Sequence, residues 1–359
     1  MDARRLAALR GPTLPTTLLL VLAIVLAACG GTATSPTPLD TAPAPTTAAA
    51  TPAPTESASP VAAFPLTLTD DEGTSVTIPA EPQHIVSLTP AATETLFALG
   101  LGDRVVGKVE DFSVYPPDAA DVPDVAKFGS VDVEQIVAKD ADLVIAGGSN
   151  FNPPEAIQKL RSLGVPTVVL FAPDLDGALK DIGLIGQAVG KPDEATAIQD
   201  DIRAAIDEVT AATAGTTKPR VFYELDATNG FFGPAPDYFG TQMIEIAGGE
   251  PLTSGQDGVY QIEAEKILEF DPEIVLLGDA AYGVTPDQVA ARPGWDAVTA
   301  VKEGAIRAID DIIVTRPGPR LGEGLRTLAL AIHPDLALPG GAPSPAASAS
   351  AGASASAAP

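Results

Sequence analysis

The chain has 359 residues, and its 47 acidic residues against 21 lysines and arginines give a formal net charge of −26. A surface of that charge repels nucleic acid and anionic lipid headgroups, so a nucleic-acid partner is disfavoured. Two histidines and one cysteine are too few for a bare zinc or manganese site of the histidine-rich kind. The length permits two domains, once segments that do not fold are set aside.

The N-terminus has the layout of a signal peptide. Residues 1–10 carry three arginines and one aspartate, and Leu18 to Ala28 is an unbroken apolar run that ends in small residues. Pro15 and the two threonines after it keep this run below the about 20 apolar residues that a membrane-spanning helix needs. We therefore predict a cleaved signal peptide and no permanent membrane span.

The apolar run ends in Leu26-Ala27-Ala28-Cys29-Gly30, and Cys29 is the only cysteine in the chain. This segment resembles the lipobox of bacterial lipoproteins, in which the cysteine is diacylated and becomes the new N-terminus. The alternatives are a small-residue cleavage site with an incidental cysteine, or a buried free thiol. A lone cysteine excludes a disulfide framework. The lipoprotein interpretation predicts an extracytoplasmic protein that two or more acyl chains anchor to the membrane.

Low-complexity sequence flanks the part of the chain that can fold. The segments after Cys29 and after Pro339 consist almost entirely of Thr, Ala, Pro, Ser and Gly, which cannot bury a core. The predicted organisation is a signal peptide (1–28), a lipidated cysteine with a disordered tether (29–63), an N-terminal lobe (64–174), a helical connection (175–217), a C-terminal lobe (218–336) and a disordered tail (337–359).

The first folded elements are a hairpin and an α/β layer. Residues 66–69 and 75–78 alternate apolar and polar side chains around Asp70-Asp71-Glu72-Gly73, which predicts a β-hairpin. Short runs rich in Val and Ile then alternate with helical patterns, which favours a mostly parallel sheet. The predicted strands are 84–88, 105–109, 143–146 and 167–171, and the predicted helices are 91–99, 132–139 and 154–163.

Helical sequence follows from residue 175 to about residue 214. Its second part has Pro192 at the first turn and apolar residues at helical spacing, among them Ile202 and Val209, which predicts one long amphipathic helix. At 1.5 Å per residue this helix would be about 33 Å long, enough to run across two lobes, although an ordinary surface helix is the alternative. A second α/β set has predicted strands 220–225, 274–277 and 306–309 and predicted helices 239–247, 263–269 and 321–332.

An internal repeat links the two sets. Residues 131–147 align without a gap on residues 262–278, and five of the 17 positions are identical. The identical pairs are Glu134/Glu265, Ile136/Ile267, Asp140/Asp271, Val144/Val275 and Gly147/Gly278. We therefore expect an α/β protein with two lobes of like topology, each a mostly parallel sheet flanked by helices. The lobes would face each other across a cleft and be joined by the long helix.

Four segments carry a family resemblance: residues 84–107 (HIVSLTPAATETLFALGLGDRVVG), Tyr115-Pro116-Pro117, the repeat, and Arg292-Pro293-Gly294-Trp295. Together they resemble the helical-backbone class of ABC-importer substrate-binding proteins, which includes vitamin B12, ferric siderophore and heme binders. The resemblance covers residues 66–334. It implies a protein with no intrinsic cofactor that captures a metal chelate carrying Co or Fe. Its partners would be a permease dimer with a cytoplasmic ATPase.

In that family an acidic residue on each lobe docks into arginine pockets of the permease. The resemblance assigns this role to Glu134 and Glu265, the two acids that the repeat also selects. The alternative is that each merely favours a helix dipole by about 0.3–1 kcal/mol from the first turn. We expect Asp132, in a capping box with Gln135, and Glu263 to cap these helices, which leaves Glu134 and Glu265 free.

Ligand contacts are expected from loops after the strands, because ligands of open α/β sheets bind outside the carboxyl ends of the strands. Aromatic residues gather in these loops, which suits a large planar ligand, although each is as readily explained as core. The family's B12 binder has aromatic pocket positions that correspond to Phe128 and Phe112, and a third near Gly147, where this chain has no side chain. The candidate ligand contacts are Phe112, Tyr115, Phe128, Phe151, Phe231, Tyr260, Tyr282 and Arg316.

The last predicted loop places two guanidinium groups, Arg316 and Arg320, near this edge. They could bind carboxylate or phosphate groups of a ligand, or pair with acids of the protein; Glu224 and Asp226 are candidate partners. No serine or cysteine nucleophile has an assignable base, so catalysis is not expected. Two other functions stay open: a bilobed sensing or interaction lipoprotein without transport, and a chelatase-like or metal-cluster enzyme.

Overall fold

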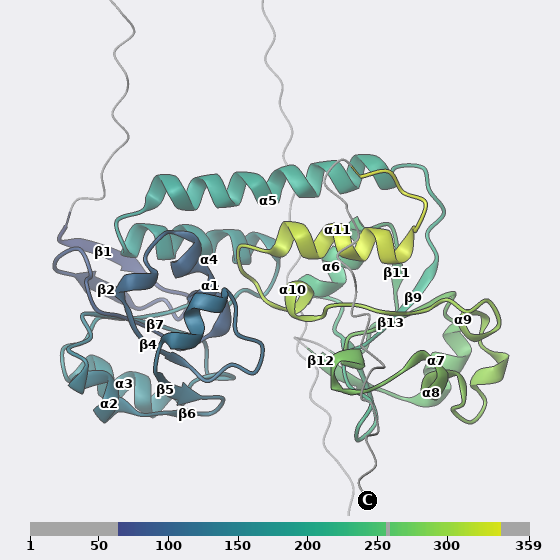
Figure 1. Cartoon of the computed structure of the whole chain (residues 1–359), viewed down its shortest axis with the longest axis horizontal. Coiled ribbons are helices and arrows are strands. Elements are labelled where there is room, and N and C mark those ends of the chain that lie inside the picture. Colours follow the sequence, from purple (N-terminus) through teal and green to yellow (C-terminus); the bar gives the residue numbers. More distant parts are fainter. Residues whose placement is uncertain (1–63, 256–258, 339–359) are drawn as a thin grey trace, which may run out of the picture. The chain divides into compact units, whose positions relative to one another are not determined.

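The computed structural model describes residues 64–255 and 259–338 (Figure 1). The predicted signal peptide, Cys29 with the tether up to residue 63, and the tail from residue 339 onwards lie outside the described residues. Within the described ranges, no helix is both long and apolar enough to cross a membrane.

The N-terminal half contains the predicted hairpin and a six-stranded sheet. The hairpin pairs β1 (Leu66–Thr69) with β2 (Ser75–Ile78), and its buried and exposed residues alternate as the sequence does. The sheet has the order β6-β5-β4-β3-β7-β8 and is parallel except for the β5–β6 pair. Its strands are β3 (Ile85–Ser87), β4 (Val105–Val109), β5 (Asp124–Lys127), β6 (Ser130–Val131), β7 (Leu143–Ala146) and β8 (Thr167–Val169).

Helices accompany this sheet where the sequence predicted them: α1 (Pro90–Ala98), α2 (Val133–Ala138) and α3 (Pro154–Ser162). Strands β3, β7 and β8 are buried along their whole length, as expected of parallel strands that are covered on both faces. The sequence did not predict β5 and β6. They are short, and exposed residues interrupt their apolar pattern, so they carry no buried-strand signal.

The C-terminal half contains a four-stranded parallel sheet of order β11-β9-β13-β14 and a two-stranded antiparallel ribbon of β10 and β12. The strands are β9 (Arg220–Glu224), β10 (Phe231–Pro234), β11 (Glu250–Pro251), β12 (Val259–Ile262), β13 (Ile274–Leu277) and β14 (Ile306–Ala308). The helices are α6 (Phe239–Ile246), α7 (Ala264–Phe270), α8 (Pro286–Ala290), α9 (Thr299–Lys302), α10 (Ile312–Thr315) and α11 (Leu321–Ile332).

The two sheets have like topology, which confirms the expected fold class. The order β4-β3-β7-β8 in the first sheet corresponds to β11-β9-β13-β14 in the second, and the repeat supplies the central strands β7 and β13. Asp140 and Asp271 hold equivalent positions after α2 and α7. They have φ values of 53° and 48° and are the only non-glycine residues with positive φ in the described chain. Aspartate tolerates this left-handed conformation better than most side chains, which explains why the repeat has the same residue at both places.

Helix α5 (Pro192–Thr213) is the predicted long helix, and it packs on helices from both halves (Figure 1). Near its start it meets α4 (Leu175–Ala188), where a Cβ on Gly186 would lie only 2.3 Å from the Cβ of Ala195. Near its end it meets α11, where Arg326 binds Glu208 at 2.6 Å. One apolar core contains residues of both sheets and of α4, α5 and α11, so the two halves share buried surface.

Candidate ligand-binding site

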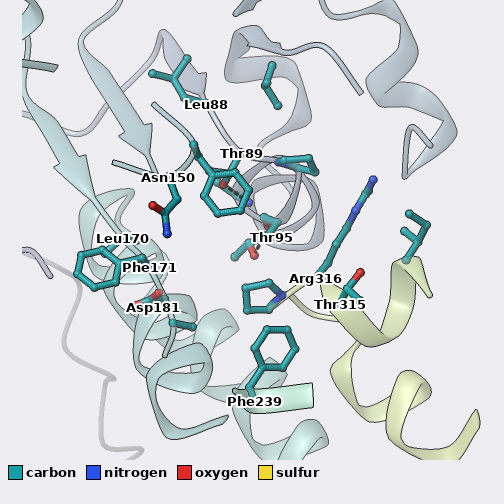
Figure 2. A pocket seen from close by; sticks show the side chains of 18 of the residues that line it. Leu88, Thr89, Thr95, Asn150, Leu170, Phe171, Asp181, Phe239, Thr315 and Arg316 are labelled. Carbon is teal, nitrogen blue, oxygen red and sulfur yellow. Dashed lines mark hydrogen bonds between the residues drawn. The ribbon is translucent and has the colours of Figure 1, made fainter. Parts of the chain in front are cut away.

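A cavity of about 1020 Å³ lies at the ends of strands from both sheets (Figure 2). Loops after β3, β4, β5, β7 and β8 supply one side, and residues after β13 and β14 supply the other. Helix α4 and the residues before α6 complete the wall. The volume is at the upper end of the range for small-molecule sites, which indicates a bulky ligand.

Exposed aromatic side chains surround this cavity. Phe112 and Tyr282, from opposite sheets, meet edge to face with ring centroids 5.8 Å apart. Phe128 and Phe151 form a second such pair at 5.9 Å. Phe112 and Phe128 are 79% and 75% exposed, so neither serves as core. Aromatic rings left open to solvent beside a cavity are suited to contact a flat, apolar ligand face.

Phe171 also lines the cavity and is exposed, but the sequence reading missed it. The sequence predicts a buried strand over 167–171, whereas β8 ends at Val169 and Phe171 belongs to the loop. The signal available in the sequence was the position of Phe171 directly before Ala172-Pro173, where a strand is expected to end.

The loop after β7 is fixed by a buried asparagine. The side chain of Asn152 accepts a hydrogen bond from the Gly147 backbone N–H at 2.7 Å and donates one to the Leu88 carbonyl at 3.3 Å. A Cβ on Gly147 would lie 3.0 Å from the Cβ of Phe151. Phe151 and Thr89 therefore leave no room for a side chain at position 147.

Three of the predicted contact residues do not line the cavity. Tyr115 lies against the guanidinium of Arg320, 3.9 Å from the ring centroid. Phe231 packs on Trp295 within the C-terminal half, with ring centroids 5.5 Å apart. Tyr260 lies on β12, in the ribbon that pairs with β10. The antiparallel ribbon, which the sequence did not reveal, holds both Phe231 and Tyr260 away from the cavity.

Arg316 lines the cavity as expected, but acids of the protein already bind its guanidinium. It donates to Glu94 at 2.9 Å and to Asp111 at 2.7 Å, and Arg320 binds the same Glu94 at 2.8 Å. Glu94, on α1, is only 2% exposed. The two arginines thus connect the segment before α11 with α1 and with the loop after β4. Of the two roles expected for them, pairing with acids of the protein is the one that the structure shows.

Glu224 does not pair with these arginines. Its fully buried carboxylate binds Arg292 through two hydrogen bonds of 2.5 and 2.7 Å. The guanidinium of Arg292 in turn stacks on Trp295 at 4.8 Å and on Phe231 at 5.0 Å. The Arg292-Pro293-Gly294-Trp295 motif therefore has a structural role inside the C-terminal half.

Two acids of the cavity lining each have a buried side-chain oxygen without a hydrogen-bond partner among the described residues. These oxygens are Oδ1 of Asp181, on α4, and Oδ1 of Asp311, after β14. Burial, followed by the neighbouring Asp71, raises the pKa of Asp181 to about 8. Burial, followed by Asp310, raises the pKa of Asp311 to about 6. The described residues contain no cluster of His, Cys, Asp and Glu that could hold a metal ion.

The repeated acids lie apart from the cavity. Glu134 and Glu265 are exposed, each in the first turn of its helix, and neither lines the cavity. Asp132 caps α2 through the Gln135 backbone N–H at 2.9 Å, as predicted. The predicted capping box does not form, because the Asp132 N–H donates to the Val125 carbonyl and the Gln135 side chain donates to the Asp132 carboxylate. The prediction for Glu263 was wrong, because this residue precedes α7 without a side-chain capping bond. Val137 and Leu268 lie three residues after these two acids, at equivalent positions of the repeat. Both are exposed apolar side chains.

Two sheets of like order, joined by one long helix and sharing an aromatic-lined cavity, define a bilobed ligand-binding protein. A family model described as "Periplasmic binding protein" matches residues 85–313. The ABC transporter substrate-binding lipoprotein YvrC of Bacillus subtilis is 32% identical over 277 residues, which cover 76% of this chain and 87% of that protein. A cobalamin-binding protein of Halobacterium salinarum is 30% identical, covering 77% of this chain and 76% of the relative.

Solved structures extend this similarity. The periplasmic heme-binding protein RhuT of Roseiflexus sp. RS-1 matches with a TM-score of 0.62 and 28% identity, covering 70% of this chain and 98% of that one. The chain belongs to the periplasmic binding protein family, as the sequence resemblance implied. The relatives named above are binding proteins, in line with the reading of this chain as a binding protein.

Proposed function

We propose that the protein captures a bulky metal chelate outside the cytoplasm and delivers it to an ABC importer. The observation that carries this proposal is the cavity of about 1020 Å³ with exposed aromatic rings from both sheets. Such a cavity suits a ligand with broad apolar faces, and cobalamin, heme and ferric siderophores are chelates of this size class. The names of the cobalamin-binding and heme-binding relatives support the same ligand class, with Co or Fe as part of the cargo.

Within this function we propose Phe112, Phe128, Phe151, Phe171 and Tyr282 as the ligand-contacting aromatics. Four of them were candidates from the sequence, and Phe171 joins them because it lines the same cavity. Arg316 contributes to the wall of the site, while its guanidinium stays bound to Glu94 and Asp111.

We propose that the permease docks on two equivalent surface patches, Glu134 with Val137 and Glu265 with Leu268. The repeat puts one carboxylate and one exposed apolar side chain at corresponding positions of both halves. A pair of related permease subunits would need such a duplicated patch. Carboxylates in this setting can form charge-assisted pairs with arginines, and the apolar neighbours add surface that is excluded from water on docking.

The test of docking pairs a transport assay with a binding assay. We expect Glu134→Ala and Glu265→Ala each to impair uptake in liposomes that contain the cognate permease and ATPase, since truncating one partner of a buried charge pair costs about 2–5 kcal/mol. Ligand affinity should stay nearly unchanged, because neither residue lines the cavity. Glu155→Ala is the matched control: Glu155 is also an exposed acid in a first helical turn, on α3, but lies outside the repeat. Full transport by the double variant would contradict docking and would favour the sensing alternative.

We propose that Cys29 carries the lipid anchor and that residues 30–63 tether the fold to the membrane. Support comes from the lipobox-like sequence and from the relative that is named a lipoprotein. Cys29→Ala should abolish lipid labelling and release most of the protein from the membrane fraction, since two or more acyl chains are needed for stable anchoring. Unchanged lipid labelling of the variant would contradict this anchor.

A further inference from the structure

Acidic side chains predominate in the lining of the cavity. Its lining contains six carboxyl groups and, in the described part of the chain, one cationic side chain, Arg316. The carboxyl groups belong to Glu110, Asp111, Asp174, Asp181, Asp237 and Asp311.

The single cation is already neutralised. Arg316 binds Glu94 and Asp111, and Arg320 binds Glu94 as well, so two guanidinium groups balance two carboxylates. The Arg316 side chain is 11% exposed, and its Nη1 also donates to the Ser113 carbonyl at 3.1 Å. An anionic ligand group would meet a guanidinium whose charge Glu94 and Asp111 already balance. The remaining acids of the lining therefore set the charge that a ligand meets.

Among the acids of the lining, Asp181 has a side-chain oxygen that could accept a hydrogen bond from a ligand. Its side chain is 7% exposed, and Oδ1 is buried without a partner while the residue lines the cavity (Figure 2). After burial, the neighbouring Asp71 adds to the raised pKa of Asp181, and the charge of Lys180 opposes it. Asp71 itself accepts from the Phe171 backbone N–H at 2.8 Å and is paired with Lys180, so it is fixed in place. Asp181 thus brings a buried oxygen without a partner to the wall of the cavity, where a donor group of a ligand could satisfy it.

We propose that this cavity selects metal chelates by charge, admitting neutral or cationic chelates that present amide or ammonium donors to Asp181 and discriminating against chelates that carry carboxylates. The inference deepens the proposed function and rests on it. A donor group satisfies the orphaned Oδ1, and leaving such a buried acceptor unpaired is unfavourable. A ligand carboxylate would instead be desolvated beside the carboxylate of Asp311, and the guanidinium of Arg316 is already bound to Glu94 and Asp111.

The experiment compares ligands that share a metal chelate and differ mainly in the charge of their peripheral groups. Cobinamide and cobyrinic acid share the corrin ring and cobalt but carry amides and carboxylates, respectively. Ferrioxamine B and its N-succinyl derivative share the ferric trihydroxamate but carry an ammonium and a carboxylate. Dissociation constants for both pairs, and for hemin with its two propionates, are measured at neutral pH with the full-length protein. We expect the amide or ammonium member of any pair that binds to be favoured by about tenfold or more, roughly the effect of one desolvated charge contact.

Variants connect the preference to the named acids. Asp181→Ala, which removes the acceptor oxygens, combined with Asp311→Asn, which removes a carboxylate, should reduce the charge preference by about tenfold, whereas Asp176→Asn should leave it unchanged. Asp176 is a matched control because it is an exposed acid on the same helix, α4, and does not line the cavity. Circular dichroism of each variant confirms folding, and the wild-type preference tests the inference without any variant.

The outcomes distinguish a failure of charge selection from a failure of the proposed function on which it rests. Equal or tighter binding of the carboxylate-bearing members, or of hemin, overturns charge selection but leaves the capture of metal chelates standing. A preference that survives the double variant Asp181→Ala with Asp311→Asn overturns the assignment to Asp181 and Asp311. Binding of no member of the panel overturns the proposed function together with this inference.

Discussion

Asp181 is a carboxyl group that the fold keeps protonated near neutral pH. Burial is the main cause of its pKa of about 8, and the neighbouring Asp71 adds to it. The unfolded chain releases the same proton near the ordinary value of about 3.9. Because the folded pKa is the higher one, this group's stabilising contribution is fully present below the unfolded pKa and is lost as pH rises through the folded pKa.

We therefore expect Asp181→Asn, which cannot ionise, to leave the free energy of unfolding nearly unchanged near pH 4 and to raise it progressively towards pH 8. With about 1.4 kcal/mol per pKa unit, the gain at the upper end is at most on the order of 5 kcal/mol. Urea unfolding of the variant and of Asp176→Asn across this pH range measures the difference. A gain of the same size at both ends of the range would mean that Asp181 does not hold its proton in the folded protein.

At the scale of elements, the crossing of α4 and α5 depends on small side chains. A Cβ on Gly186 would lie 2.3 Å from the Cβ of Ala195 and 2.9 Å from the Lys191 carbonyl oxygen, so α5 approaches α4 at this point without intervening atoms. Helix propensity alone would favour alanine over glycine by about 1 kcal/mol. The close approach outweighs that preference, because a Cβ there forces two packed helices apart.

We expect Gly186→Ala to lower the free energy of unfolding by about 1–3 kcal/mol, the usual cost of overpacking. Gly183→Ala on the same helix is the comparison. Its added Cβ would meet only the end of the flexible Gln199 side chain, at 2.7 Å, so the loss should be smaller. Thermal or urea unfolding of the two variants provides the measurement. If Gly186→Ala were the more stable of the two, the tight crossing of α4 and α5 would be refuted.

At the scale of the whole molecule, three features oppose a wide opening of the cavity. Helix α5 packs on both α4 and α11, one apolar core includes residues of both sheets, and Glu94 binds Arg316 and Arg320. Few residues are then free to absorb large changes of φ and ψ on ligand binding.

We expect the radius of gyration, measured by small-angle X-ray scattering, to change little when a metal chelate saturates the protein. Glu94→Gln should enlarge the ligand-dependent change, because it leaves two arginines without their buried carboxylate, a loss of about 3–5 kcal/mol for a buried pair. Glu81→Gln is a suitable control, since Glu81 pairs with Arg104 at an exposed site. A wide ligand-driven closure of the unmodified protein would contradict the stiff connection.

Most of the elements could be predicted from the sequence, because local patterns dictate them. Continuous Val and Ile runs mark buried parallel strands such as β7 and β13, which the structure reproduces residue for residue. The helical spacing of Ile202 and Val209 after Pro192 marks α5. The repeat selects Glu134 and Glu265 and also explains the paired left-handed aspartates, because equal backbone turns favour equal residues.

The tertiary structure alone decided which side chains meet. Phe231 and Tyr260 occur in loops or short strands like those of Phe112 and Tyr282, yet the β10–β12 pairing removes them from the cavity. Arg316 meets Glu94, 222 residues earlier in the chain, and Glu224 meets Arg292 instead. Partners so distant in sequence are fixed by how the sheets and helices pack, and no local pattern encodes that. The burial of Asp181 beside Asp71 is likewise fixed by tertiary packing, and the proposed charge preference of the cavity rests on it.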